Sequence, residues 1–532
     1  MDTSYNDIPY MGRVHFQTHI EKLSLSARIF GMETTSLEKA RVLELGCGDG
    51  SNIISMALHF PKAEFVGIDG STVHIERGRK MLEYAGTTNV RLEAMDISHL
   101  QDQFGTFDYI ICHGVFSWVP ETVRGHILRI CREQMNPLGI GYISYNAYPG
   151  WKQYEMLRDM MHFHVVRQEE QKEQLLQARA LVQFLSSHIP DTDNDPYGRF
   201  ISAQEDFILG LSDEYLYHEY LEAHNQPYWF YEFIRLLNEH ALQYLGDTDF
   251  TSMLSLHWPE ETKEILNTIA TTQYELEQYM DMLRGRRFRC TLFVHHARDV
   301  TREIEPDVFK DFYYSYKACD KWSYVAATGT IEPPSVERSA EDIIATLVNS
   351  IENSSIQNKL QIAIFQHLHK MWPKRVHFNE LREIAAISKG ESLSRAEVLG
   401  MAELLQTLYL MSEIKIHLFC PSARNTIPEK PHLNSVARYQ ASYQKVISTQ
   451  LHNMVGIRED WAQEMVMLMD GTRTVDQLAD DLYAKLQKGE GTPLECKDED
   501  GNEITGKENI IALLKAQTLK KVVFFLENGA LI

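Results

Sequence analysis

The first 150 residues alternate between short apolar runs and segments whose apolar residues have helical spacing. The run RVLEL at 41–45 ends in the glycine-rich GCGDG and passes into SNIISMALHF, where apolar residues recur every three or four positions. That order predicts a strand, a turn and a helix. Four further strand-like runs follow: EFVGID, VRLEAMD, FDYIICHG and GIGYISYNAY. Because helical segments separate most of these runs, we predict an α/β fold with a parallel, doubly wound sheet.

The pattern changes after Pro149-Gly150-Trp151. Residues 152–188 carry apolar residues at three- and four-residue spacing, many charges and no glycine, which predicts a long amphipathic helix. An aromatic-dense stretch that follows the turn-rich IPDTDNDPYG also has a mostly helical pattern. We therefore expect one helical middle domain over residues 151–300.

The rest of the chain predicts two units of helices followed by a strand. Residues 340–420 show three helical segments and then the strand-like EIKIHLF. In the second unit, VDQLADDLYAKL and NIIALLKAQTL have helical spacing, and KVVFFLENGALI predicts a closing strand or hairpin. The proline-bearing joint TGTIEPPSVERS precedes the first unit, and the linker PSARNTIPEKPHLNS separates the two. Both units resemble winged-helix arrangements, so the predicted domains are 1–150, 151–300, 301–425 and 426–532.

Length, charge and cysteine usage narrow the class of protein. The 532 residues exceed the ~100 to 200 of a typical domain. The net charge of -22 argues against binding to nucleic acid or to anionic lipid, which needs clustered positive charge. No apolar run reaches the ~18 residues of a membrane span, and the polar, acidic N-terminus does not resemble a secretory signal. The seven cysteines form no CxxC pair, which predicts reduced thiols, no metal site and a cytoplasmic protein without a membrane partner.

The combination of a glycine turn and a downstream acid is the strongest chemical signal. The turn is Glu44-Leu45-Gly46-Cys47-Gly48-Asp49-Gly50, and Asp69-Gly70 ends the next predicted strand. Gly46 and Gly48 let the backbone approach a ligand closely, and the following helix offers free N–H groups to a carboxylate. Asp69 lies 23 residues after Gly46, near the ~20-residue spacing at which an acid meets ribose hydroxyls in doubly wound folds. This pattern is typical of a site for an adenosine cofactor.

The acids around the turn distinguish between adenosine cofactors. A dinucleotide fingerprint reads GxGxxG, whereas this turn reads GxGxG and has Glu44 and Asp49 beside it. A pyrophosphate is repelled by carboxylates, whereas the sulfonium and ammonium of S-adenosylmethionine are stabilised by them. Asp96 follows the third strand, where it could accept from the adenine amino group while Ile97 packs on the ring. We therefore predict S-adenosyl-L-methionine as the cofactor and a Rossmann-like class I methyltransferase domain.

Further candidates lie at the ends of the fourth and fifth strands, where open α/β sheets bind their ligands. His113 either contacts the methionine end of the cofactor, serves as a base or hydrogen-bonds to backbone. Trp118 either covers the adenosine or the acceptor, or belongs to the core. Tyr145 and Asn146 end the next strand, and aromatic faces of this kind stabilise cationic ligands.

Several motifs together resemble the bacterial protein lysine methyltransferases best known for modifying rickettsial outer-membrane protein. In the first domain they are Asn6-Asp7-Ile8-Pro9-Tyr10, Gln17-Thr18-His19, LELGCGDGSN, HGVFSWVP and YNAYPGW. Later motifs are similar to the methyltransferase regulatory domain of that family and to its C-terminal region. They are His218-Glu219-Tyr220-Leu221-Glu222, Tyr244-Leu245-Gly246, Arg286-Arg287-Phe288-Arg289, PHLNSVARYQAS and LMDGTRTVDQLA.

The resemblance implies an acceptor that composition does not indicate: lysine side chains of a protein substrate, such as an outer-membrane or surface protein before export. The amine attacks the sulfonium methyl after losing its proton, from a resting pKa of ~10.4. Candidates for orienting the amine are Tyr10, His113, Tyr145 and Asn146, while Gln17 and His19 either close over the cofactor or only pack.

Other interpretations stay open at this point. A small-molecule methyltransferase would share every cofactor residue and would have an enclosed pocket. A non-catalytic regulator would sense the cofactor and bind a protein or DNA through the winged-helix units. The choice between a monomer and a homodimer is also open. The basic strip from Arg284 to Arg289 predicts an internal salt-bridge network more readily than a partner site.

Overall fold

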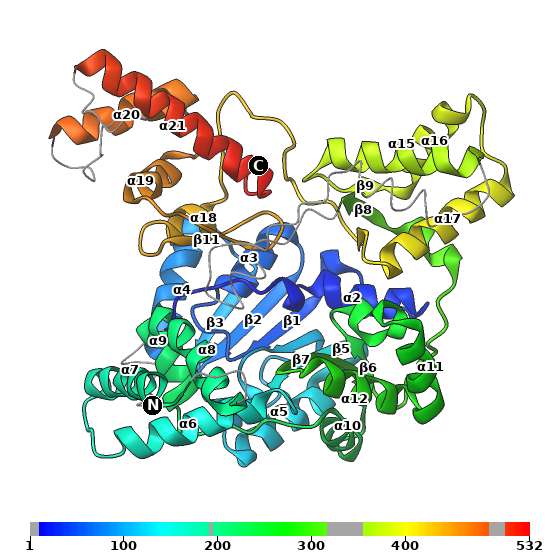
Figure 1. Cartoon of the computed structure of the whole chain (residues 1–532). Helices are drawn as coiled ribbons and strands as arrows, with labels where there is room; N and C mark the ends of the chain where they lie inside the picture. Colours follow the sequence, from blue (N-terminus) through cyan, green and yellow to red (C-terminus); the bar gives the residue numbers. More distant parts are fainter. Residues whose placement is uncertain (1–9, 191–194, 317–354, 489–505) are drawn as a thin grey trace.

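A seven-stranded sheet organises the computed structural model, which describes residues 10–190, 195–316, 355–488 and 506–532. The strand order is β3-β2-β1-β4-β5-β7-β6, and the first five strands run parallel. These are β1 (Arg41–Leu45), β2 (Glu64–Asp69), β3 (Val90–Ala94), β4 (Phe107–Cys112) and β5 (Met135–Asn146). The reversal of order beside β1 is the signature of a doubly wound sheet, so the predicted α/β fold is confirmed (Figure 1).

Helices in the connections cover this sheet. They are α2 (Ile20–Ile29), α3 (Ser51–His59), α4 (Thr72–Ala85) and α5 (Glu121–Gln134). Helix α4 packs on β2 and β3, α5 packs on β5, and α2 packs on β5 and β6. Local sequence sets the ends of α4, because the Ser71 side chain accepts from the His74 amide at its start and Gly86 adopts a left-handed φ of 66° after its end. The crossover helices therefore leave the carboxyl ends of the parallel strands at one edge of the sheet.

The segment predicted to be helical over 151–300 also contains two strands. Its helices are α6 (Trp151–Val165), α7 (Gln171–His188), α8 (Pro196–Gly210), α9 (Asp213–Leu216), the π-helix η5 (Tyr217–Leu221), α10 (Phe230–Glu239), α11 (Glu260–Ile269) and α12 (Gln273–Arg284). However, β6 (Leu242–Asp247) and β7 (Phe288–His295) extend the sheet as antiparallel strands beside β5. The segment is mostly helical, as expected, but the sequence pattern did not indicate these two strands, because the apolar residues of β6 continue the spacing of α10 and the pairing strand lies far along the chain. The domain boundaries at residues 150, 300 and 425 stay predictions.

Two smaller units follow. The first joins β8 (Tyr313–Tyr316), β9 (Val376–His377) and β10 (Ile414–His417) into a small sheet with α15 (Ser355–Met371), α16 (Phe378–Lys389) and α17 (Arg395–Leu410). The second contains α18 (Ser435–Gln440), β11 (Val446–Ser448), β12 (Met454–Gly456), α19 (Asp460–Leu468), α20 (Val475–Lys488) and α21 (Lys507–Glu527). This second unit has a hydrophobic core of its own. The predicted joint at 328–339 lies outside the described residues.

Helix α21 replaces the closing strand predicted from KVVFFLENGALI. The run KVVFFLE continues the helix that begins at Lys507, and Val522 and Phe525 are both buried three residues apart. That spacing suits one helix face, whereas a strand would have placed them on opposite faces. The helical pattern that precedes Val522 and Val523 therefore outweighs the preference of these two β-branched residues for a strand.

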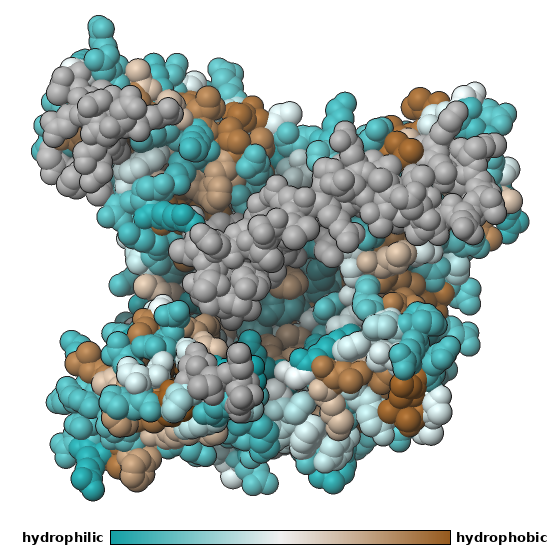
Figure 2. All heavy atoms as spheres, viewed as in Figure 1, coloured by the Kyte–Doolittle hydropathy of each residue, from teal (hydrophilic) through white to brown (hydrophobic). Residues whose placement is uncertain are grey.

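The second C-terminal unit packs against helices that cover the seven-stranded sheet. Helix α18 contacts α3 and α4, the helices that follow β1 and β2. Figure 1 shows this unit above the carboxyl ends of these strands, and Figure 2 shows the same face hollowed near its centre. Elements distant in sequence therefore surround the edge of the sheet where a ligand is expected.

Candidate active site

The glycine turn between β1 and α3 has the geometry that its sequence predicts. Gly46, Gly48 and Gly50 all have positive φ values, of 72°, 55° and 74°. A Cβ on Gly46 would lie 2.4 Å from the Val115 Cγ2 atom, so a side chain there would collide with the loop after β4. The Gly46 amide also donates to the Ile68 carbonyl at 2.8 Å. The turn is therefore fixed between β2 and the β4 loop.

Two carboxylates next to this turn are positioned by backbone amides. Asp69 accepts from the Gly48 amide at 2.8 Å and from the Ser71 amide at 2.8 Å. Asp96 accepts from the amide and the hydroxyl of Ser98, at 2.8 and 2.7 Å. Burial raises the pKa of Asp96, but the hydrogen bonds from Ser98 outweigh it and hold the pKa below its usual value. Both side chains line the same cavity and are ready to accept hydrogen bonds from a ligand.

Glu44 is a buried carboxylate of the turn whose hydrogen bonds are incomplete in the absence of a ligand. It is 3% exposed, and its Oε1 atom accepts from the Asn52 side-chain amide at 2.7 Å. Its Oε2 atom is buried without a hydrogen-bond partner among the described residues. Burial raises its pKa to about 8, and the charges of Asp69 and Asp49 add to the effect. A cation beside Glu44 would offset the free-energy cost of ionising this buried carboxylate. The turn therefore fits the sulfonium and ammonium of S-adenosylmethionine.

An extended N-terminal segment, residues 10–15, lies over the turn. A Cβ on Gly12 would lie 2.2 Å from Oδ2 of Asp49, which shows how closely the segment approaches. The His15 amide donates to the Asn52 Oδ1 atom at 3.0 Å. The segment and the turn are therefore in direct contact. Residues 6–9 of the N-terminal motif lie outside the described residues.

Residues of the second C-terminal unit form hydrogen bonds with both the N-terminal segment and residues in and after the glycine turn. The Gln444 side-chain amide donates to the Gly12 carbonyl at 3.0 Å, and Tyr443 donates to Asp49 at 3.3 Å. The His452 ring lies 2.9 Å from Oδ1 of Asn52. The sequence gives no local signal for these three residues, because their partners lie some 400 positions away. The motif PHLNSVARYQAS ends at Ser442, one residue before Tyr443.

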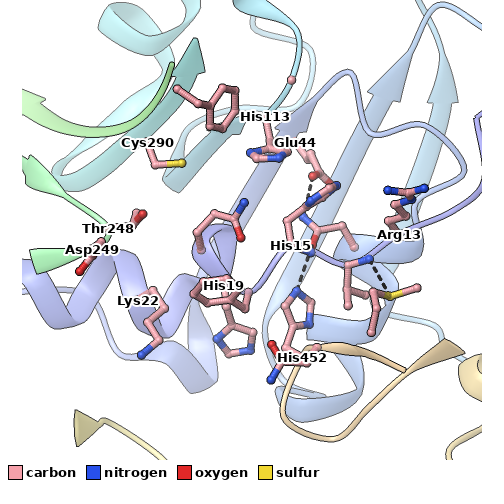
Figure 3. A pocket seen from close by; sticks show the side chains of 18 of the residues that line it. Arg13, His15, His19, Lys22, Glu44, His113, Thr248, Asp249, Cys290 and His452 are labelled. Carbon is pink, nitrogen blue, oxygen red and sulfur yellow. Dashed lines mark hydrogen bonds between the residues drawn. The ribbon is translucent and has the colours of Figure 1, made fainter. Parts of the chain in front are cut away.

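One cavity of about 2230 Å³ connects these groups. Figure 3 shows His15, Glu44, His113 and His452 converging on it from separate parts of the chain. Its lining includes every candidate cofactor residue: Glu44, Gly46, Cys47, Gly48, Asp49, Asp69, Gly70, Asp96, Ile97, His113 and Trp118. Tyr10, Gln17, His19 and Asn146 line it as well. The structure therefore brings together most of the residues that the sequence singles out.

Tyr145 does not line the cavity. Successive side chains of a strand point to opposite faces, and on β5 it is Asn146 that faces the cavity. The Tyr145 ring instead stacks on Phe233 at a centroid distance of 4.0 Å, and its hydroxyl lies 3.3 Å from the Thr291 hydroxyl. The expectation that Tyr145 orients the acceptor is wrong for this geometric reason.

His113 lies in the cavity as a neutral imidazole. Its Nδ1 atom is 2.7 Å from the Tyr142 hydroxyl, which in turn lies 3.1 Å from the Cys290 Sγ atom. Its ring is 4.1 Å from the His15 ring, centroid to centroid. Burial lowers the pKa of His113 well below its usual value, and the charge of His15 adds to the effect. A neutral imidazole does not repel a sulfonium, so His113 is compatible with contact to the cofactor.

Two arginines of the basic strip form the internal salt-bridge network that the sequence favours. Arg289 is fully buried and pairs with Asp281 at 2.6 Å and Glu277 at 3.0 Å. Arg286 pairs with Asp247 at 2.9 Å. These ion pairs join α12, β6 and β7 and leave neither arginine available as a partner site.

Neither a candidate metal cluster nor a membrane-spanning helix is found among the described residues. No three His, Cys, Asp or Glu side chains there gather where they could share a metal ion. No helix in the same part of the chain combines the length and the apolarity that a bilayer crossing requires.

Family models match three parts of the chain. Residues 36–192 match a methyltransferase domain, and residues 212–295 match a predicted methyltransferase regulatory domain. Residues 429–529 match the C-terminal winged-helix domain of PKMT, the protein lysine methyltransferases. The three matches follow one another along the chain without overlap.

Related proteins cover nearly the whole chain. The Rickettsia prowazekii protein RP028 is 36% identical over 231 residues, which are 43% of this chain and 92% of that protein. RP789 of the same organism is 29% identical over 99% of this chain and 93% of its own length. The structure of PKMT2 from Rickettsia typhi in complex with AdoHcy (S-adenosylhomocysteine) superposes with a TM-score of 0.81 at 28% identity, covering 98% of this chain and 100% of that one. The chain belongs to the bacterial protein lysine methyltransferase family that carries a methyltransferase regulatory domain, and it is an S-adenosylmethionine-dependent methyltransferase.

Proposed function

We propose that this enzyme transfers methyl groups from S-adenosylmethionine to lysine side chains of a protein that is later exported to the outer membrane or cell surface. The size of the cavity is the observation that best supports a protein as the methyl acceptor. Pockets for small ligands are typically ~300 to 1,000 Å³, whereas this cavity measures about 2230 Å³. The volume left beside the cofactor suits a segment of polypeptide better than a small molecule. A small-molecule acceptor, which would favour an enclosed pocket, is therefore the weaker alternative.

The cofactor roles follow from the chemistry of each side chain. Glu44 and Asp49 would stabilise the positive charges of the cofactor, and the amides around Gly46, Cys47 and Gly48 would contact its carboxylate. The remaining contacts divide between the nucleoside and the methyl group. Asp69 and Gly70 would contact the ribose, Asp96 and Ile97 the adenine, and His113 and Trp118 the region of the methyl group.

The bound cofactor supplies an electrophilic methyl group on its sulfonium. The chain has to present a neutral amine to that methyl, because the ammonium form of lysine has no free electron pair. Tyr10, His113 and Asn146 all face the cavity and are the candidates for orienting the amine. An apolar, aromatic wall disfavours the ammonium and so lowers the pKa of an entering lysine.

Reduced thiols and acidic charge support a cytoplasmic enzyme that acts on its substrate before export. All five cysteines in the described residues are free, as expected in a reducing compartment. The net charge of -22 supports a protein partner over nucleic acid. A homodimer is an open alternative, to be decided by the mass of the enzyme in solution.

The test is transfer of a labelled methyl group from S-adenosylmethionine to bacterial envelope proteins, followed by mass spectrometry. We expect label on lysine with the wild-type chain. Asp69→Ala should weaken cofactor binding about 10- to 100-fold, since a hydrogen bond to a charged group is worth ~1.5 to 3 kcal/mol. Asp102→Ala, which changes an exposed acid of the same domain, is the matched control and should bind normally. Label on another residue type would refute the acceptor, and normal binding by Asp69→Ala would refute the assigned site.

A further inference from the structure

The π-helix η5 carries an acid into the cavity that the cofactor roles leave unused. Glu219 lies in this element and lines the same cavity as the glycine turn. Single π-helical turns are rare and occur frequently at functional sites. Within the part of the chain that the structure describes, no hydrogen bond or ion pair is recorded for its carboxylate. The Glu219 carboxylate is therefore an acid in the cavity that the fold itself does not use for an ion pair or a hydrogen bond within the described residues.

Tyrosine side chains from three elements line the cavity near this carboxylate. The charge of Glu219 is the largest cause that raises the pKa of Tyr215, and it also raises the pKa of Tyr220. Tyr154 comes from α6, which packs on η5 (Figure 1). All three tyrosines line the cavity. Rings and a carboxylate together form the usual environment for an alkylammonium group.

The cations near Glu219 are held by other partners. Arg158 donates to the backbone carbonyls of Glu219 and Glu222, both at 2.6 Å. Arg287 donates to the Tyr154 hydroxyl, and its Cζ atom lies 4.9 Å from that ring. Neither arginine forms an ion pair with the Glu219 carboxylate within 4 Å. The carboxylate thus stays available to a cation that enters the cavity.

Contacts run continuously from this acid to the cofactor turn. The Arg158 Cζ atom lies 5.3 Å from the Trp118 ring centroid. The Trp118 amide donates to the Val115 carbonyl at 2.8 Å, and Val115 is the residue against which Gly46 packs. Glu219 and the glycine turn therefore lie on one continuous wall of the cavity.

We propose that Glu219 binds the amino group of the acceptor side chain and takes its proton, an assignment that rests on the proposed function. The ammonium gives its proton to the carboxylate, which becomes a carboxylic acid. The freed electron pair forms a bond to the methyl carbon while the carbon–sulfur bond breaks, leaving a methylated ammonium and neutral S-adenosylhomocysteine. Glu219 then returns the proton to solvent.

The acidity of Glu219 suits this role. Burial raises its pKa to about 7, against the charges of Arg158 and Arg287, which lower it. A base is most effective when its pKa lies near the working pH. The same two arginines, together with Arg13 near Tyr215, disfavour a second positive charge and so lower the pKa of the incoming ammonium.

The experiment compares Glu219→Gln with wild type in the full chain, using poly-L-lysine as acceptor from pH 6.5 to 10. We expect kcat/KM of the variant to fall at least about 100-fold at pH 7, the lower end for loss of a general base. The defect should shrink by up to about tenfold per pH unit as the acceptor loses its proton to water. Glu214→Gln, which changes a neighbouring acid outside the cavity lining, should match wild type. Binding of S-adenosylhomocysteine should be unchanged in both variants.

Three results would overturn the assignment. An unchanged kcat/KM in Glu219→Gln, with lysine methylation by wild type, would refute the role of Glu219 and leave the proposed function standing. A defect that is constant with pH, or that comes with weaker S-adenosylhomocysteine binding, would indicate a structural role. No methyllysine from the wild-type chain would refute the proposed function itself.

Discussion

Cofactor binding should release close to one proton at pH 7, and Glu44 should be its source. With a pKa of about 8 in the empty site, roughly 90% of Glu44 is protonated at pH 7. A cationic cofactor beside the buried carboxylate favours its ionised form, so the proton leaves as the cofactor enters. Ionising the group against a difference of about one pKa unit costs ~1.4 kcal/mol, or about tenfold in affinity.

The sign of the pH dependence follows from the same group. Below pH 8 the protonated form predominates, so affinity for S-adenosylmethionine should rise with pH, by at most about tenfold per unit, and level off above pH 8. Calorimetric titration at pH 7 in buffers of different ionisation enthalpy measures the protons released directly. Wild type should release about 0.9 proton and Glu44→Gln none, with weaker binding in the variant.

A matched control and a clear refutation are available. Asp102→Asn changes an exposed acid of the same domain and should release as many protons as wild type. Equal release by wild type and Glu44→Gln would show that another group titrates. Affinity that falls as pH rises from 6 to 8 would contradict the view that Glu44 carries the cationic end of the cofactor.

Three further predictions concern packing and stability. Gly12→Ala places a methyl group 2.2 Å from Asp49, so the N-terminal segment should detach; limited proteolysis should then cut near residue 12 more readily, and an unchanged digestion pattern would argue against the contact. The raised pKa of Glu44 means that folding stability is lost as pH rises from about 4.5 to 8, so Glu44→Gln should raise the Tm of the cofactor-free chain at pH 9 but not at pH 4; a higher Tm at both values would point to another cause. Arg289→Met removes the buried cation that pairs with Glu277 and Asp281, so it should lower the free energy of unfolding by ~3 to 5 kcal/mol in a urea titration, and a loss below ~1 kcal/mol would contradict this.

The cofactor side of the site was predictable because its determinants are local. Gly46 and Gly48 are needed for positive φ values in a turn between a strand and a helix. Asp69 and Asp96 follow neighbouring strands of a parallel sheet, so their side chains meet at one edge. Strand and helix periodicity placed these residues without knowledge of any distant contact.

The remaining features depend on contacts that local patterns do not encode. Strands β6 and β7 form because β7 pairs with β5 and β6 pairs with β7. Alternation indicates that only one of Tyr145 and Asn146 faces the cavity, but the register of the sheet decides which one. Tyr443 and His452 reach the turn only through the packing of the last unit.

The chemical identity of the methylated product decides most directly whether this chain methylates lysine side chains of proteins. Acid hydrolysis of protein labelled by this enzyme with S-adenosyl-[methyl-¹³C]methionine, followed by amino-acid analysis, should yield ¹³C in Nε-methylated lysine. Label confined to small molecules or to methyl esters, or no transfer despite cofactor binding, would contradict the assignment of this chain as a protein lysine methyltransferase.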